Sequence, residues 1–335
     1  MNGPREVSDM FDFLRKRKRF CGPGSRAFAG SRVSRTACAG FTLIEMLVSM
    51  AVLSIIMAGV VTAITTAEQT YARTAPKQDM YENVRGVAEL MAQEIGQAGL
   101  VSLPAITTSA AITASGAAQA VTTSSTTGAF VGEKVLVDAS IANEETVTLT
   151  AVSATQLTGI FAKSHLTAAP INAMGTFPSG VVPNSGTDPS SATTLNLFGD
   201  INGDGTMVYV RYVCTVGTTA APGTLTRSVT TITPGVNTIS PSQTLLSTVI
   251  GPAGGCFQYV TQTDNTTGTN YTFVTSVGFT VSVQTTVTDP QTGQYATMTK
   301  SFLNLSPRNV AAALEQSIAN NATRLQASPP NVASY

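Results

Sequence analysis

The longest apolar stretch of this chain directly follows a single acidic residue, Glu45. Residues 46–64 carry no charge, and most of them are Leu, Ile, Val, Met or Ala. As an α-helix, at about 1.5 Å per residue, this stretch spans ~28 Å, which is close to the roughly 30 Å hydrocarbon thickness of a bilayer. The pattern predicts a single transmembrane helix over about residues 41–64.

An amphipathic helical pattern follows the apolar stretch. Five apolar residues recur in it at spacings of three or four: Met80, Val84, Val87, Met91 and Ile95. This spacing places them on one face of a helix and predicts that the face packs on a folded domain. Pro76 has no N–H to donate, so we expect it to break or kink the helix between its two halves. Gly96 and Gly99 are the expected stop signals.

Short stretches of alternating apolar and polar residues predict β-strands in much of the remaining chain. Residues 130–137, 145–152 and 156–161 predict a small β-meander. Six further stretches predict a larger sheet, and they cover residues 207–214, 225–232, 244–250, 256–260, 271–287 and 295–305. The last two flank a predicted hairpin turn that runs from Asp289 to Gly293.

The segments between these patterns differ in composition. Residues 101–128 are mostly Ala, Thr and Ser with few large apolar side chains, so we expect a linker or an exposed loop. Residues 168–198 are rich in Pro, Gly, Ser, Thr and Asn. Residues 310–325 have apolar residues at helical spacing, and Pro329 with Pro330 is expected to end that helix.

These patterns predict an α+β fold, in which a long N-terminal helix packs on a mainly antiparallel β head. The predicted division is a leader at residues 1–40, a spine helix at 41–100 and a head at 101–335. Because the β-meander interrupts the connection from the helix to the larger sheet, we expect residues 129–165 to be a small insertion on the head. The leader is expected to have no fold of its own, and it starts at Met1 or at Met10.

The junction between the leader and the helix carries a specific motif: Gly40, Phe41, Thr42, Leu43, Ile44 and Glu45. With a basic leader before it and an apolar helix after it, this motif resembles the class III signal of type IV prepilins and related pseudopilins. The resemblance implies a pilin-like fold and cleavage between Gly40 and Phe41 by a membrane-embedded prepilin peptidase. It also implies N-methylation of Phe41 and assembly of the helix with those of other major and minor pilins.

Glu45 is the residue of this motif that most needs a physical explanation. An acidic residue in a spanning segment costs roughly 2.5–3.5 kcal/mol at the bilayer centre, so it usually has a partner. After cleavage Glu45 lies in the first helical turn, where the helix dipole favours a negative charge. The resemblance implies that it pairs with the α-amino group of a neighbouring subunit during assembly. An uncleaved membrane anchor and an ordinary secretory signal cut near Ala67 are the simpler interpretations.

Charge is distributed unevenly along a chain whose net charge is zero. Residues 1–40 hold nine Lys or Arg against three Asp or Glu, and the rest holds ten against sixteen. The basic run at residues 15–19 is expected to stay in the cytoplasm. The head would then lie in the periplasm of a single-pass inner-membrane protein, and in the pilus after assembly. Because the expected cleavage removes the basic run, no nucleic-acid partner is expected.

The four cysteines are also distributed between the leader and the head. Cys21 and Cys38 lie in the leader, whereas Cys214 and Cys256 remain in the expected periplasmic head. An oxidising compartment favours a disulfide between these two, which would close a loop of about forty residues and stabilise the head by roughly 3–4 kcal/mol. Two free buried thiols are the alternative.

Two further segments look like PilW-type minor pilins: residues 84–100 and, over a shorter length, residues 306–310. The resemblance implies a minor pilin of a type IV pilus that helps to initiate assembly or to cap the filament. A pseudopilin of a type II secretion system has the same N-terminal features and stays an alternative. A membrane-tethered adhesin with a Thr-rich head and an exported hydrolase are alternatives from other classes.

One segment suggests a metal site. Asp200, Asn202 and Asp204, with Gly205 at the sixth position, match the first half of a calcium-binding loop. The twelfth position is Arg211, where a bidentate acid should stand, so the alternative is a turn that leads into a strand. Calcium is therefore the only cofactor considered.

The sequence offers little for catalysis, and we expect no enzyme. His165 is the only histidine, so a HExxH zinc site is excluded, and we expect it to be a surface residue of a loop. No Gly-x-Ser-x-Gly elbow and no Gly-Lys-Ser/Thr phosphate loop occurs. Catalysis by a pair of carboxylates stays open.

Overall fold

The computed structural model describes residues 41–183, 189–233 and 238–334. The chain divides into two compact units, Met1–Thr62 and Ala63–Tyr335. The predicted leader, with Gly40 and the two cysteines Cys21 and Cys38, lies outside the described residues. Helix α1 (Leu43–Gln97) begins in the first unit and ends in the second.

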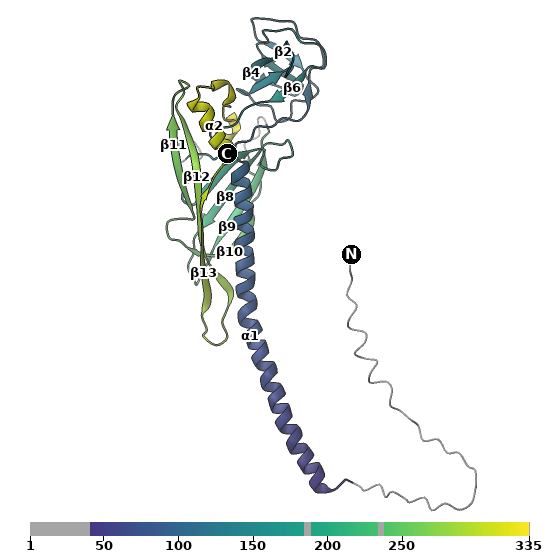
Figure 1. The fold of residues 1–335 in the computed structure, drawn as a ribbon, viewed down its shortest axis with the longest axis vertical. Coiled ribbons are helices and arrows are strands. Elements are labelled where there is room, and N and C mark those ends of the chain that lie inside the picture. The colour runs from purple at the N-terminus through teal and green to yellow at the C-terminus, as the bar shows by residue number, and fades with distance from the viewer. Residues whose placement is uncertain (1–40, 184–188, 234–237, 335) are drawn as a thin grey trace, which may run out of the picture. The chain divides into compact units, whose positions relative to one another are not determined.

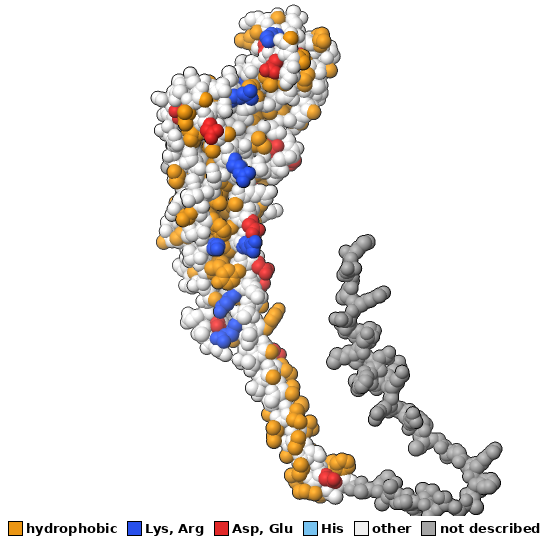
Figure 2. Space-filling view, in the orientation of Figure 1, with side chains coloured by type: hydrophobic (Ala, Val, Ile, Leu, Met, Phe, Trp, Pro, Cys, Tyr) orange, Lys and Arg blue, Asp and Glu red, His pale blue; other side chains and the backbone are white. Residues whose placement is uncertain are grey.

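In the first unit the described residues are helical from Leu43 onward, and their side chains are exposed. Among the described residues α1 is the one helix that is long and apolar enough to cross a membrane. Figure 2 shows apolar side chains over much of this part of α1. Beyond Glu45, the exposed surface of this helical part is uncharged, which suits it to lipid or to other apolar helices.

The second unit contains the amphipathic half of α1, and the predicted stripe is buried there. Met80, Val84, Val87, Met91 and Ile95 belong to the largest apolar cluster of the chain. We expected a break or a kink at Pro76, and the break is wrong, because α1 continues through this residue. A kink there stays a prediction. The loss of one helical hydrogen bond at Pro76 costs less free energy than is gained when the following turns pack on the sheet. The helix ends at Gln97, two residues before Gly99, which adopts a left-handed φ of 88°.

The sheet that α1 packs on has seven strands, which all pair antiparallel. The strands are β7 (Thr194–Gly199), β8 (Val208–Thr215), β9 (Gly223–Thr231), β10 (Gln243–Gly251), β11 (Phe257–Asp264), β12 (Tyr271–Thr288) and β13 (Tyr295–Leu305). Their order is β11-β12-β10-β9-β8-β7, with β13 also paired to β12. In Figure 1, β8, β9 and β10 lie beside α1.

Strand β12 is long enough to have three neighbours. Its first half pairs with β11, Ser282 and Val283 pair with β10, and its second half pairs with β13 along the other edge. The predicted hairpin between β12 and β13 is confirmed, and Gly293 in its turn has a φ of 65°. Asp289 at this turn accepts hydrogen bonds from the Arg73 guanidinium of α1, at 3.0 and 3.1 Å.

Strand β7 was not predicted, because its residues do not alternate. Five of its six residues are buried, which means that both faces of the strand are covered. Leu195 and Leu197 face the cluster that contains α1, whereas Phe198 belongs to a second cluster with Phe177 and Tyr209. A strand that is buried on both sides lacks the period-two signal from which strands are predicted.

A second sheet of six strands forms from residues 106–173. The strands are β1 (Ile106–Thr107), β2 (Gln119–Thr122), β3 (Lys134–Val137), β4 (Glu145–Val152), β5 (Gln156–Gly159) and β6 (Pro170–Ala173). Their order is β1-β6-β3-β4-β5-β2. The two ends of this order meet through a Thr108–Thr123 bridge and hydrogen bonds of 2.8 Å from Ser109 to Thr122 and from Ser124 to Thr107. The sheet therefore closes on itself and leaves neither end strand unpaired.

The expectation of a linker or exposed loop at residues 101–128 is wrong, since β1 and β2 lie there. Isolated apolar residues of this segment, Ile106, Ile112 and Val121, are buried inside the closed sheet. A small closed sheet needs few large side chains to fill its interior, so low apolar content did not mean absence of structure. The closed sheet is also wider than the expected insertion at residues 129–165.

The C-terminal segment begins with helix α2 (Arg308–Ile318), which is shorter than the predicted helical span. Asn320 has a left-handed φ of 58°, and the Asn321 N–H donates to the Gln316 carbonyl at 2.9 Å, which closes the helix. Pro329 and Pro330 therefore do not end it. The short helices η1 (Ala322–Arg324) and η2 (Pro330–Ser334) follow.

The segment after α2 contacts both sheets, because Leu325 belongs to the large apolar cluster of the seven-stranded sheet and the residues around it hydrogen-bond to the six-stranded sheet. The Gln326 side chain accepts a hydrogen bond from the Lys134 N–H at 2.8 Å and donates to the Lys134 and Met174 carbonyls at 2.6 and 2.7 Å. The Lys134 ammonium donates to the Ala322 and Leu325 carbonyls at 2.5 and 3.0 Å. The predicted fold class, α+β and pilin-like with a long apolar N-terminal helix and antiparallel sheets, is confirmed.

Candidate functional site

Thr42 and Glu45 form a reciprocal arrangement at the start of α1. The backbone N–H and the hydroxyl of Thr42 donate to Glu45 Oε2 at 2.9 and 3.0 Å. In return, the Glu45 N–H donates to Thr42 Oγ1 at 3.3 Å. This is a capping box, in which a Thr and a Glu three residues later satisfy backbone donors that the first helical turn leaves free. The sequence analysis included Thr42 in the motif but missed its capping role, although the Thr-x-x-Glu spacing predicts such a box.

The apolar helix after this box also satisfies its own polar groups. The hydroxyls of Ser49, Ser54 and Thr62 donate to the carbonyls four residues earlier, at distances from 2.7 to 2.8 Å. These hydroxyls therefore present no unpaired donor to an apolar environment. In the described part of this stretch, Glu45 is the one ionisable side chain.

The predicted cleavage junction lies at the edge of the described residues. Gly40 is outside them, whereas Phe41 is described and 76% exposed. Cleavage after Gly40, N-methylation of Phe41 and pairing of Glu45 with an amine stay predictions.

A buried ionic cluster joins α1 to the seven-stranded sheet, and sequence analysis did not find it. Glu94 is 4% exposed, although it lies on the amphipathic half of the helix. Its carboxylate accepts hydrogen bonds from the Tyr212 hydroxyl and from the Arg227 guanidinium, which come from β8 and β9. Burial, followed by the adjacent Glu94 charge, raises the pKa of the Tyr212 hydroxyl far above its usual value. These bonds form only when α1 packs on the sheet at one position along its axis, so the cluster fixes that position.

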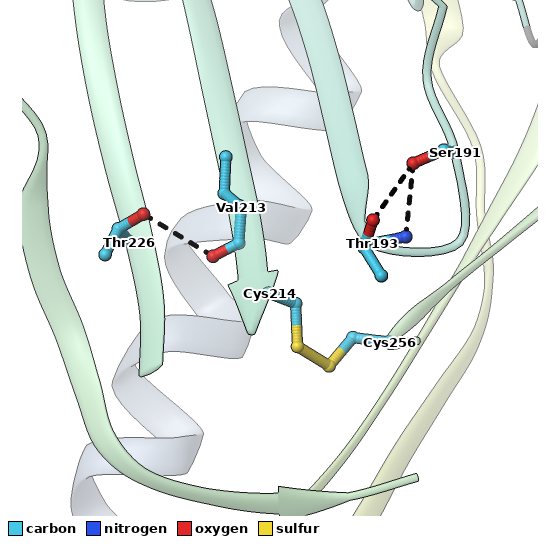
Figure 3. Close-up of a disulfide and its surroundings, with 6 residues drawn as sticks. All are labelled: Ser191, Thr193, Val213, Cys214, Thr226 and Cys256. Carbon is cyan, nitrogen blue, oxygen red and sulfur yellow. Dashed lines mark hydrogen bonds between the residues drawn. A yellow bond between two sulfur atoms is a disulfide. The ribbon is translucent and has the colours of Figure 1, made fainter. Parts of the chain in front are cut away.

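Cys214 and Cys256 form a disulfide between the end of β8 and the start of β11 (Figure 3). Both cysteines are 1% exposed and belong to the same apolar cluster as the buried face of α1. Beside them, the Thr226 hydroxyl donates to the Val213 carbonyl at 3.5 Å. The bond links residues that are 42 positions apart in the sequence. It cross-links strands β8 and β11, which are not neighbours in the sheet.

The loop that starts at Asp200 is held by its own backbone. The Asp200 carboxylate accepts hydrogen bonds from the Asp204 and Gly205 N–H groups, at 3.1 and 3.0 Å. Both carboxylate oxygens are thus used within the turn that leads into β8, and the described residues hold no cluster of three His, Cys, Asp or Glu suited to a metal. These two backbone N–H donors hold the loop in its conformation without a bound ion. Calcium binding at Asp200, Asn202 and Asp204 stays a prediction, and melting temperature during calcium titration tests it.

The expectation that His165 is a surface residue is wrong. The side chain is 2% exposed, Nδ1 lies 2.7 Å from Asp138 Oδ2, and Nε2 lies 2.6 Å from Glu145 Oε1. Both contacts are hydrogen bonds donated by the ring only when both nitrogens carry protons. The two carboxylates come from the end of β3 and the start of β4, so sequence separation concealed them. His165 thus fastens its loop to the closed sheet.

A second buried acid lies directly before strand β3 of the same sheet. Glu133 is 0% exposed, and its Oε2 accepts a hydrogen bond from the Phe130 N–H at 3.3 Å. Its Oε1 has no partner among the described residues. Burial raises the pKa of this carboxyl to about 8, so it is largely protonated at neutral pH.

Comparison with known proteins adds one finding. The family profile described as the prokaryotic N-terminal methylation motif matches residues 35–61, which include the capping box and most of the apolar stretch. No curated protein and no solved structure matches the chain. The motif implies processing by a prepilin peptidase and pilin partners in general, and the apolar helix after it fits membrane anchoring. Together they indicate a type IV pilin-like protein, either a pilin or a pseudopilin.

Proposed function

We propose that this chain is a minor pilin of a type IV pilus, which helps to initiate assembly or to cap the filament. One observation carries the proposal: a capped acidic residue, Glu45, directly precedes the uncharged and exposed helical stretch at residues 46–64, within a matched N-terminal methylation motif. Such a helix can exchange a lipid environment for a bundle of similar helices without exposing a polar group. The proposed role is structural, and it requires no catalytic site.

The proposed sequence of events follows from the charges. Before cleavage the basic leader holds the N-terminus in the cytoplasm, and the head lies in the periplasm. Cleavage by the prepilin peptidase creates an α-amino group at Phe41, four residues before Glu45. The Glu45 carboxylate of an arriving subunit is hydrogen-bonded by Thr42 but has no cationic partner among the described residues of its own chain. It then attracts the amine of a neighbour in the apolar filament core, where the surrounding low dielectric strengthens the attraction.

N-terminal mapping of the protein from membranes tests the proposal most directly. The mature chain should begin at Phe41 and should carry one methyl group on its α-amino group. A Gly40→Leu variant should keep its leader and migrate with the protein from peptidase-null cells. Recovery of wild-type protein with the leader attached, or cut beyond residue 64, would contradict the proposal.

Substitution of Glu45 separates its charge from its capping role. Glu45→Gln keeps an amide that can complete the capping box, whereas Glu45→Ala removes both functions. If the charge drives assembly, both variants should be processed and neither should enter filaments. Normal incorporation of Glu45→Gln would show that the charge is not needed.

The same N-terminal features suit a pseudopilin of a type II secretion system. Recovery of a tagged chain in sheared surface pili, and its loss in cells without the pilus assembly motor, would support the minor pilin. A secretion defect with normal surface pili would support the pseudopilin instead.

A further inference from the structure

A pocket of about 190 Å³ lies beside α1 in the second unit. One wall comes from α1 between Pro76 and Val84, and the others come from residues 245–248 of β10 and 283–286 of β12. These elements lie side by side in Figure 1. The volume suffices for a few water molecules or for one extended side chain.

Gln284 is the polar group of this pocket that lacks a partner. The side chain is 3% exposed, and its Nε2 donates to the Thr219 carbonyl at 3.0 Å, which sets the orientation of the amide. Its Oε1 accepts no hydrogen bond among the described residues. Because buried polar atoms are almost always paired, a ligand that donates a hydrogen bond would satisfy this oxygen.

The charge at the pocket is negative. Asp79 is the only charged residue that lines it, is exposed, and makes no ion pair within the described part of the chain. No lysine or arginine lines the pocket. The pocket therefore offers acceptors and a negative charge without a cation.

Cations of the same helix do not supply the missing charge. Arg73 is held by Asp289 of the β12–β13 turn. Lys77 lies two residues before Asp79, and side chains at this spacing point to different faces of a helix. A cation that pairs with Asp79 would therefore come from outside the residues that line the pocket.

We propose that this pocket receives a lysine side chain of a neighbouring pilin subunit. An ammonium group is compact and carries three rotatable donors, which suits acceptors that come from a helix and a strand. An arginine is less suited, because its planar fork matches a single carboxylate and not separated acceptors. The inference rests on the proposed function, since a neighbouring subunit is present only if the chain assembles.

A small amine tests the chemistry of the pocket. The probe is n-butylammonium, added to the mature full-length chain in detergent micelles, with n-butanol at equal concentration and NaCl at equal ionic strength as controls. The ¹⁵N side-chain resonance of Gln284 should shift saturably with the amine and not with the alcohol. Asp79→Asn should weaken the apparent affinity at least fivefold, whereas Glu82→Gln, on the same helix and outside the pocket, should not.

Three results would overturn the proposal. One is no saturable shift, which means that water alone occupies the pocket. Another is an equal shift with n-butanol, which means that the pocket takes any small apolar chain. The third is an unchanged affinity in Asp79→Asn, which means that the carboxylate does not contribute.

Cross-linking in filaments tests the partner. A zero-length carbodiimide should join Asp79 to a lysine of another subunit, as peptide mass spectrometry would show, and Asp79→Asn should lose this product while Glu82→Gln keeps it. A chain that is cut at Phe41 and found in filaments but gives no Asp79 cross-link overturns this inference and leaves the proposed function intact. A chain that never enters filaments removes both the proposed function and the neighbouring subunit.

Discussion

The two sheets of the second unit are stabilised in different ways. The seven-stranded sheet and the amphipathic half of α1 share one large apolar cluster, which also contains the disulfide. The closed six-stranded sheet has a much smaller apolar interior, and it buries Glu133, Asp138 and His165. The larger region gains most of its stability from removing apolar surface from water, although it also buries the ionic cluster at Glu94. The smaller one has fewer apolar side chains to bury and depends more on buried polar groups and their hydrogen bonds. This difference predicts that they respond differently to truncation, to pH and to loss of a single polar group.

Truncation in the large core should have the greatest effect. Phe279 is 0% exposed, and its ring lies 5.7 Å from Phe257 and 6.4 Å from Phe302. Phe279→Ala should lower the free energy of unfolding by about 3–5 kcal/mol, because it leaves a cavity among close-packed rings. Val287 on the same strand is 52% exposed, and Val287→Ala should change this free energy by less than about 0.5 kcal/mol. Guanidinium denaturation of the mature chain in micelles, followed by near-UV circular dichroism, measures both.

The pH dependence of the closed sheet should be the next largest effect. The pKa of Glu133 is raised from 4.5 to about 8, so the folded state holds a proton that the unfolded state releases above pH 4.5. The contribution of Glu133 to stability is therefore most favourable below pH 4.5, and it falls as the pH rises toward 8. Glu133→Gln should remove this fall, with a gain on the order of 3 kcal/mol at pH 8 and little change at pH 4. Melting temperatures at the two pH values check it, and an equal gain at both would contradict it.

Loss of the buried histidine should have a smaller and local effect. His165→Asn removes the partner of two carboxylates and should destabilise the closed sheet by about 2–3 kcal/mol. Hydrogen exchange should become faster in β3 and β4 and stay unchanged in β8 and β9. Leu166→Ala, at a neighbouring side chain that is 79% exposed, is the matched control. Faster exchange throughout both sheets would mean that they unfold as one cooperative unit.

The joint between the sheets should be the most weakly affected. Gln326→Ala removes three hydrogen bonds to β3 and to the segment after β6, so the Lys134 N–H should exchange faster by an amount equivalent to about 1–2 kcal/mol. Thr323→Ala, at an exposed position of η1, should leave that exchange rate unchanged. An unchanged Lys134 rate in Gln326→Ala would show that apolar contacts hold the joint.

Local patterns in the amino-acid sequence were sufficient for several elements. The period of the stripe from Met80 to Ile95 predicted the buried face of α1, and alternation predicted β4 and the β12–β13 hairpin. The N-terminal motif from Gly40 to Glu45 was also visible without a structure. Such features depend on residues that are close in sequence, so their period or spacing identifies them directly.

Other features depend on contacts between distant segments, and only the tertiary structure reveals them. Strand β7 is covered on both faces and has no period, and β1 and β2 are too short to predict without the strands that pair with them. Packing also decided that α1 continues through Pro76, since the following turns bury their apolar face on the sheet. His165 and Glu94 are buried because their partners arrive from other strands, and these hydrogen bonds compensate the loss of water around each polar side chain. Sequence alone sufficed where the cause was local, and the fold was needed where a group's environment consists of residues far away in the chain.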